Sequence, residues 1–143
     1  MHTVQRSVLV SYSAAQMFDL VDKVTDYPKF LPWCGGSEER NRTEKSVDAS
    51  VVIQFAGLKQ RFTTHNTLDY PRSIDLALVD GPFSSLNGRW EFLPLAEDAC
   101  KVVFTLEYAF AGRAVETIIG PVFNRIATSF IDAFTKRADE IYG

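Results

Sequence analysis

Apolar and polar residues alternate in short runs through the middle of the chain, between Ser37 and Phe110. The clearest run places five apolar residues on one face of a strand: Val47, Ala49, Val51, Ile53 and Phe55. This two-residue period is typical of half-buried β-strands. Turn signals separate the runs: Ala56-Gly57-Leu58, Tyr70-Pro71-Arg72 and Asp80-Gly81-Pro82. Because a parallel pair needs a connection of about a dozen residues or more, these short turns predict an antiparallel sheet.

The beginning of the chain predicts one more strand and then a helix. Residues 1–10 alternate like a strand, and Ser13 with Gln16 forms a capping box, so a helix is expected from Ala14. Its apolar stripe is Met17, Phe18, Val21 and Val24.

The end of the chain, residues 113–142, predicts a long helix, because apolar residues recur there at helical spacing. The stripe is Ile119, Val122, Phe123, Ile126, Phe130, Phe134, Ala138 and Ile141. Gly120-Pro121 should bend or restart this helix, since proline removes an amide donor and its ring clashes with the preceding turn.

The segment 26–36 is short, rigid and apolar. Pro28 can occupy the first turn of a short second helix, and Pro32 would end that helix. Phe30, Leu31 and Trp33 then lie at a bend, which suits either the mouth of an apolar cavity or a plug in the core.

The order of these elements predicts an α+β fold in which the long helix lies against a curled sheet. A helix about 10–12 Å wide does not fill a wide, curved sheet. An empty, sealed void of roughly 400 Å³ would cost on the order of 10 kcal/mol at about 24 cal/mol per Å³. We therefore expect that aromatic side chains fill the space, that it opens to solvent, or that an apolar ligand occupies it.

Length and composition favour one globular domain, residues 1–143, with a substantial core. The net charge of -3 disfavours a non-specific nucleic-acid binder, so DNA is not an expected partner. No secretory signal opens the chain, and no apolar run approaches the ~18 residues of a membrane span. A cytoplasmic protein is expected, with a place at the periphery of the inner membrane as an alternative.

The order of elements resembles the helix-grip fold of the START-like superfamily. Three stretches are similar to its coenzyme Q-binding branch, whose bacterial members are also named RatA-type ribosome association toxins or oligoketide cyclases: residues 27–34 (YPKFLPWC), 81–92 (GPFSSLNGRWEF) and 120–127 (GPVFNRIA). The resemblance implies a curved antiparallel sheet of about six to seven strands wrapped around the long C-terminal helix, with two short helices after the first strand. It also implies that the protein binds or transports a lipophilic molecule. Ubiquinone or a related isoprenoid lipid is the favoured candidate, and such binding would support respiration. No catalysis and no cofactor are implied.

Carried onto this sequence, the resemblance gives a set of candidate ligand-binding residues. The motifs supply Phe30, Leu31, Trp33, Phe83, Leu86 and Trp90, and the helical stripe supplies Phe123, Ile126 and Phe130. Flat aromatic rings suit a quinone head, and Val51, Ile53 and Leu106 would accommodate a prenyl tail. Core packing is the other interpretation of each of these residues.

Two alternatives use other parts of the chain. As a RatA-type toxin, the protein would bind the large ribosomal subunit and block subunit association. A basic edge of Arg40, Arg42, Lys59 and Arg61 could contact RNA phosphates, although Glu38, Glu39, Glu44 and Asp48 weaken it and a solvated sheet edge has the same composition. As a polyketide cyclase, it would need an acid or base inside the cavity. Strand alternation places Arg89 and Glu91 on the opposite face from Leu86 and Trp90, and Glu107 would also have to point inward.

The remaining reactive residues predict no catalytic or metal site. Cys34 and Cys100 do not form a C-x-x-C pair, and Cys34 is expected to be a buried apolar residue. His2 is expected at a frayed terminus, and His65 on a solvated strand face, without metal-ligand spacing. Leu58 and Phe83 at turn tips could touch a membrane transiently, but isolated apolar surface residues are common.

Overall fold

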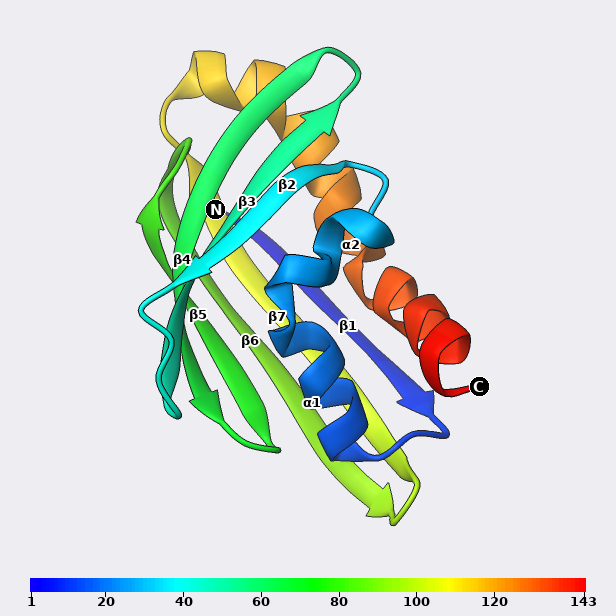
Figure 1. Ribbon diagram of the computed structural model, residues 1–143. Coiled ribbons are helices and arrows are strands. Elements are labelled where there is room, and N and C mark those ends of the chain that lie inside the picture. The colour runs from blue at the N-terminus through cyan, green and yellow to red at the C-terminus, as the bar shows by residue number, and fades with distance from the viewer.

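Seven strands form a single antiparallel sheet, and the helices pack against it. The computed structural model describes all residues, Met1–Gly143. Its elements follow in the order β1 (His2–Val10), α1 (Ala14–Asp22), the 3₁₀ helix η1 (Val24–Lys29), β2 (Cys34–Arg40), β3 (Ser46–Phe55), β4 (Leu58–Asp69), β5 (Ser73–Asp80), β6 (Phe83–Ala96), β7 (Ala99–Phe110) and α2 (Arg113–Tyr142). The strand order in the sheet is β1-β7-β6-β5-β4-β3-β2, so the first strand pairs with the last (Figure 1).

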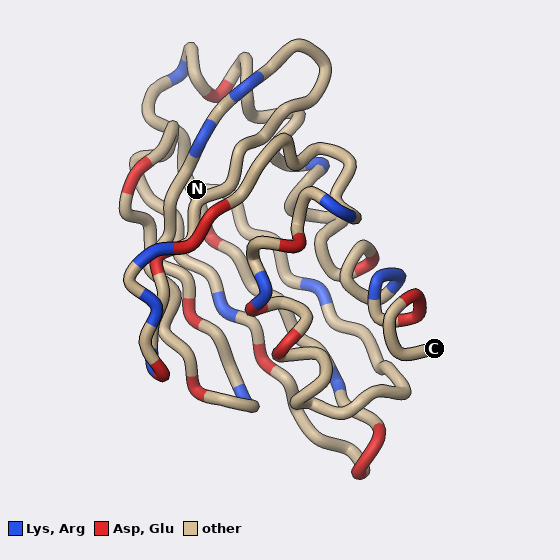
Figure 2. The backbone as a smooth tube through the Cα atoms, viewed as in Figure 1, with Lys and Arg blue, Asp and Glu red and all other residues tan.

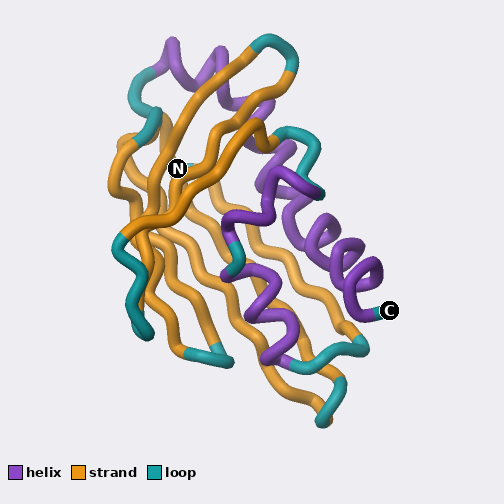
Figure 3. Tube along the Cα trace, in the orientation of Figure 1, coloured by secondary structure: helices purple, strands orange, loops and turns teal.

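The helix-grip expectation is confirmed. The sheet is curved, the strands form one layer, and α1, η1 and α2 form the other (Figure 3). Aromatic side chains of α2 contact the sheet along the helix: Phe123 lies 4.8 Å from Phe83 of β6, and Phe134 lies 5.2 Å from Trp90 of the same strand, measured between ring centroids. The long helix therefore spans the concave face that the sequence pattern assigned to it.

Local signals position the first helix and the β3–β4 hairpin. The Ser13 hydroxyl accepts the Gln16 amide at 3.1 Å, and the Gln16 side chain accepts the Ser13 amide at 2.9 Å, so the capping box begins α1 as expected. Ala56 and Gly57 both have positive φ angles, 51° and 83°, as a two-residue hairpin turn of the primed type requires. This turn sets the β3–β4 register, in which Ala49 lies opposite Thr64.

The segment after α1 differs in one respect from the expectation. The 3₁₀ helix η1 runs from Val24 to Lys29, so Pro28 lies near its end rather than in its first turn. A 3₁₀ helix tolerates this position because it is short and its last residues need few internal hydrogen bonds. Leu31 and Trp33, which follow it, are buried, and Phe30 is half-buried.

Helix α2 is continuous from Arg113 to Tyr142 with Pro121 inside it. In Figure 1 its gold N-terminal part runs at an angle to the orange and red part, which is the bend expected at Gly120-Pro121. The buried stripe includes Ile119, Phe123, Ile126, Phe134 and Ala138 as predicted, but it also includes Ile131, and Ile141 is exposed near the C-terminus. No helix in the protein is both long enough and apolar enough to cross a membrane.

Three surface expectations are wrong. Phe83 is not an exposed turn tip: it begins β6 and is buried among aromatic rings. Phe55, at the end of the predicted inward face of β3, is exposed because the strand leaves the core there. His2 is not frayed, since its ring stacks on Tyr108 and its Nε2 lies 2.8 Å from a Glu116 carboxylate oxygen of α2.

Candidate functional site

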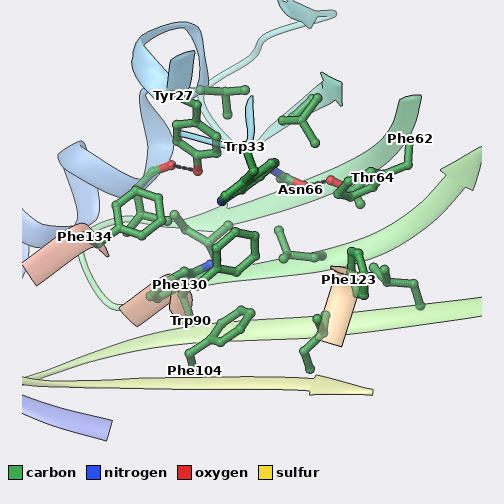
Figure 4. A pocket seen from close by; sticks show the side chains of 18 residues that line it. Tyr27, Trp33, Phe62, Thr64, Asn66, Trp90, Phe104, Phe123, Phe130 and Phe134 are labelled. Atoms are coloured by element: carbon green, nitrogen blue, oxygen red, sulfur yellow. Dashed lines mark hydrogen bonds between the residues drawn. The ribbon is translucent and has the colours of Figure 1, made fainter. Parts of the chain in front are cut away.

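A small cavity lies between the concave face of the sheet, η1 and α2. It is lined by 18 residues, and 16 of them are hydrophobic: Val21, Val24, Tyr27, Trp33, Ala49, Val51, Phe62, Ile74, Leu76, Leu86, Trp90, Phe104, Leu106, Phe123, Phe130 and Phe134. Thr64 and Asn66 of β4 are the two polar residues (Figure 4). The cavity volume is about 60 Å³.

This volume shows how the space under the helix is filled. Aromatic side chains occupy most of it, so the roughly 400 Å³ void considered from the sequence does not form. At about 24 cal/mol per Å³, an empty cavity of this size costs only about 1.4 kcal/mol. A benzene-binding cavity measures ~150 Å³, so a six-membered ring enters here only if wall side chains move.

The structure brings seven of the twelve sequence-predicted site residues to the cavity wall: Trp33, Val51, Leu86, Trp90, Leu106, Phe123 and Phe130. They come from five elements or connections of the chain. Trp33 precedes β2 and faces Phe130 of α2 with 5.5 Å between ring centroids. Trp90 of β6 and Phe104 of β7 pack at 4.4 Å.

The other five predicted residues do not line the cavity. Phe30 points away from it, toward a crevice between η1 and the end of α2, where the Arg137 guanidinium lies 5.1 Å from the ring centroid. Leu31, Ile53 and Ile126 are buried in the core. Phe83 packs in an aromatic group described below. The four buried residues follow the apolar pattern of the wall residues, but their neighbours fill the space around them.

That aromatic group, the packed cluster, consists of Phe83, Tyr108, Phe110 and Phe123. Phe83 stacks on Phe110 at 5.4 Å, and Phe123 meets Phe83 and Tyr108 edge to face at 4.8 Å each. These are the separations at which aromatic pairs attract one another. Phe123 also lines the cavity, so it marks the border between the filled and unfilled parts of the concave face.

The polar pair Thr64–Asn66 stands on the cavity wall among apolar residues. Both residues are buried, each 6% exposed, and the Thr64 hydroxyl donates to Asn66 Oδ1 at 2.7 Å. The pair points inward because residues two apart on a strand share a face, and buried Phe62 and Leu68 lie on the same face of β4. The sequence expectation of a polar, solvated strand holds only for the other face, where His65 is exposed beside Asp48 at 2.7 Å.

Sequence reasoning missed this pair because Thr63, Thr64, His65, Asn66 and Thr67 are all polar. The signal that could have found it is the alternation itself: Phe62 and Leu68 are the apolar residues of the strand, and positions 64 and 66 share their parity.

The cavity wall contains no group poised for acid–base chemistry. Tyr27 is the one lining residue with an ionisable side chain, and burial raises the pKa of its hydroxyl far above the usual value. That hydroxyl donates to the Val21 carbonyl oxygen. Arg89 lies on the outer face, as predicted, where its guanidinium pairs with Asp75 at 2.7 Å.

The two thiols are free and buried. Burial raises the pKa of both the Cys34 and the Cys100 thiols. A raised pKa keeps a thiol protonated and a poor nucleophile, so the thiols have the character of packing residues.

The predicted basic edge is largely neutralised. Arg42 pairs with Asp22 at 3.0 Å and with Glu39 at 2.7 Å, and Arg40 and Arg61 both pair with Glu38. Figure 2 shows acidic and basic residues following one another along this part of the backbone. The Arg42 guanidinium holds the pKa of Glu39 below its usual value, so both groups stay charged at neutral pH.

Comparisons with known proteins agree with this fold. The family model described as "Polyketide cyclase / dehydrase and lipid transport" matches residues 10–135. The chain is 47% identical over 143 residues to "Ribosome association toxin RatA" of Vibrio cholerae. The aligned region covers 100% of this chain and 99% of that protein. It is 44% identical to "Persistence and stress-resistance toxin PasT" of Escherichia coli O6:H1, over 99% of this chain and 90% of the relative. A mitochondrial coenzyme Q-binding protein of Xenopus laevis is 25% identical over 96% of this chain and 58% of its own length.

Two solved structures have the same architecture. An 18 kDa protein from Caulobacter crescentus superposes with a TM-score of 0.76 and 34% identity, over 100% of this chain and 99% of that one. The Zhui aromatase/cyclase from Streptomyces has a TM-score of 0.84 over 96% of this chain and 93% of its own, and at 16% identity it shows the fold alone. The matched fold, the matched length and the apolar cavity lead to one conclusion: this chain belongs to the polyketide cyclase/dehydrase and lipid transport family.

Proposed function

We propose that the protein binds a lipophilic small molecule in the cavity between the sheet and α2, and that it does so without catalysis. The observation that carries this proposal is the composition of the wall, in which 16 of 18 side chains are apolar and a single polar pair stands among them. Ligand sites in proteins have this composition, an apolar surface with a few placed polar groups. The lack of an acid or base on the wall disfavours a cyclase reaction.

An isoprenoid quinone such as ubiquinone is the ligand class that fits best. Aromatic rings from η1, β6, β7 and α2 can stack on a flat head group, while Val51 and Leu106 offer an aliphatic surface to a tail. The name of the Xenopus laevis relative supports this choice.

Binding requires the cavity to widen. Phe130 is half-buried and contacts Trp33 across the cavity, so outward rotation of the Phe130 ring is one way to open it. The energy of ligand contacts then offsets the contacts that this ring loses.

Extraction of gently purified protein with organic solvent, followed by mass spectrometry, tests the proposal directly. We expect an isoprenoid quinone or a related lipid in the extract. The extract of Trp90→Ala should contain less of it, because this variant lacks one of the aromatic rings that would contact the ligand. Both tryptophans of the chain line the cavity, so intrinsic fluorescence reports its occupancy. Absence of any lipid from the extract, together with unchanged fluorescence when a short-tailed ubiquinone is added, would rule the proposal out.

A second candidate function is association with the ribosome, and the full-length identity to the Vibrio cholerae and Escherichia coli toxins favours it. This activity would use the outer surface and not the cavity. In the basic edge, Arg42 and Arg61 already pair with carboxylates, which argues against a simple phosphate-binding patch there.

Sedimentation of ribosomes with added protein separates the two functions. Accumulation of free subunits that persists in Trp90→Ala would assign ribosome association to the outer surface. If free subunits no longer accumulate with Trp90→Ala, ligand binding and ribosome association would instead be linked.

A further inference from the structure

We infer that the cavity selects ligands whose head group carries a hydrogen-bond acceptor, and that the amide nitrogen of Asn66 is the group that selects them. This inference rests on the proposed function and deepens it, since it assigns a chemical class to the head of the ligand. The evidence is the hydrogen-bond inventory of the Thr64–Asn66 pair.

An asparagine side chain has one acceptor oxygen and an amide nitrogen with two donors. In Asn66 the oxygen receives the Thr64 hydroxyl, and the nitrogen Nδ2 donates to no protein atom. No fully buried side-chain nitrogen or oxygen in the protein lacks a partner, so Nδ2 retains open space next to it. Because Asn66 is only 6% exposed and lines the cavity, that space is the cavity.

Nδ2 donates to no lining side chain. Apart from the Thr64–Asn66 pair, the only lining hydroxyl belongs to Tyr27, and it donates to the Val21 carbonyl oxygen. Figure 4 shows Asn66 beside Trp33, with Thr64 on its other side. The indole N–H groups of Trp33 and Trp90 are further donors on the wall, and neither donates a hydrogen bond within the protein.

An unpaired donor on an otherwise apolar wall discriminates between head groups that carry an acceptor and those that do not. A ligand carbonyl or ether oxygen at Nδ2 satisfies a donor that is otherwise shielded from bulk water. A hydrocarbon of the same shape leaves that donor unsatisfied, which carries a free-energy penalty. Thr64 holds Asn66 in place through the 2.7 Å bond, so Thr64 is a positioning residue and Asn66 is the contact.

Two ligands of matched shape test this inference: 4-butylacetophenone, which has a carbonyl acceptor, and 1-butyl-4-isopropylbenzene, in which a CH group replaces the carbonyl carbon and a methyl group replaces the oxygen. Affinity for the ketone is measured from the fluorescence of Trp33 and Trp90, and affinity for the hydrocarbon from its displacement of the ketone. In Asn66→Leu we expect the ketone to bind about fivefold more weakly, the effect of one net hydrogen bond. The hydrocarbon should bind as well as before or better.

A second variant protects the test against a folding failure. T64V/N66L replaces both partners with apolar groups of similar shape, which is close to neutral for stability, and it should show the same selective loss of ketone affinity. Thr67→Val, on the exposed face of the same strand, is the matched control and should change neither affinity.

Each outcome decides a different point. Equal weakening of both ligands in Asn66→Leu, or unchanged ketone binding, would overturn the role of Asn66 and leave the apolar site standing. Failure of the wild-type protein to bind either ligand would overturn the proposed function, and this inference with it.

Discussion

The two ends of the concave face are built from the same kinds of residue, yet one is filled and the other is not. In the packed cluster, rings from β6, β7 and α2 meet edge to face and stacked, with no space left between them. Around Trp33, Asn66 and Phe130, rings of the same sizes line a cavity. One difference lies in β4: Phe62 lines the cavity and also packs against Phe83 of the cluster, whereas the shorter polar side chains Thr64 and Asn66 lie further along the cavity wall. Two polar residues on one strand therefore distinguish the cavity wall from the packed core.

The largest expected effect comes from emptying the filled end. Phe83→Ala should lower the free energy of unfolding by about 3–5 kcal/mol, because a buried ring is lost among rigid neighbours. Phe130→Ala at the cavity should cost less than half as much, since that ring is already half-exposed. Urea unfolding followed by circular dichroism measures both. Equal losses would show that the two ends do not differ in packing.

Two matched substitutions on β3, each of which adds one methyl group, test the same contrast between filled core and cavity. Val47 and Val51 share one face of the strand, but only Val51 lines the cavity. Val47→Ile should destabilise the protein by about 1–3 kcal/mol, because its site is already full. Val51→Ile should be neutral or stabilise it by up to about 0.8 kcal/mol, because the added carbon enters free space. A cost for Val51→Ile as large as that for Val47→Ile would contradict the cavity.

The polar pair gives a smaller effect with a distinctive pattern. Thr64→Val should lower the free energy of unfolding by about 1 kcal/mol, because Asn66 Oδ1 loses its donor. The double variant T64V/N66L should recover most of that loss. Chemical unfolding of the two single variants and the double variant completes the cycle. Additive losses would mean that Thr64 and Asn66 are not coupled.

The smallest effect concerns the two thiols, one of which is next to the cavity while the other is at the far end of β7. Cys34 follows Trp33 at the cavity, whereas Cys100 is fully covered within β7. Since burial raises the pKa of both thiols, alkylation at pH 7.5 should be slower than for a free thiol and should accelerate as the pH rises toward the raised values. Occupancy of the cavity by 4-butylacetophenone should alter the rate at Cys34 and leave Cys100 unchanged. Mass spectrometry of tryptic peptides measures each rate, and a parallel change at Cys100 would point to global loosening.

Periodicity predicted the sheet, the long helix and the inward faces that contain Leu106 and Phe123, because burial of one face of a strand or helix leaves a direct mark on the sequence. Trp90 was proposed from the family motif. It could not separate wall from core. Ile53 and Val51 lie on the same face of β3. Val51 lines the cavity and Ile53 is packed in the core, and this difference depends on how the surrounding side chains fill the space. Asn66 was missed for a different reason: a polar residue on an inward face has no apolar signal of its own, and only its shared parity with Phe62 and Leu68 shows which way it points.

The sheet order has a consequence for how the protein is made. Strands β2 to β7 pair with their neighbours in sequence, but β1 pairs only with β7. Val10 of β1 pairs with Cys100, which is synthesised ninety residues later. At a ribosomal rate of about 5–20 residues per second, β1 lacks its partner for several seconds or more. Helix α2 is translated after every strand. The apolar face that becomes the cavity is therefore uncovered in the nascent chain, and a lipophilic molecule could meet it before the last helix closes.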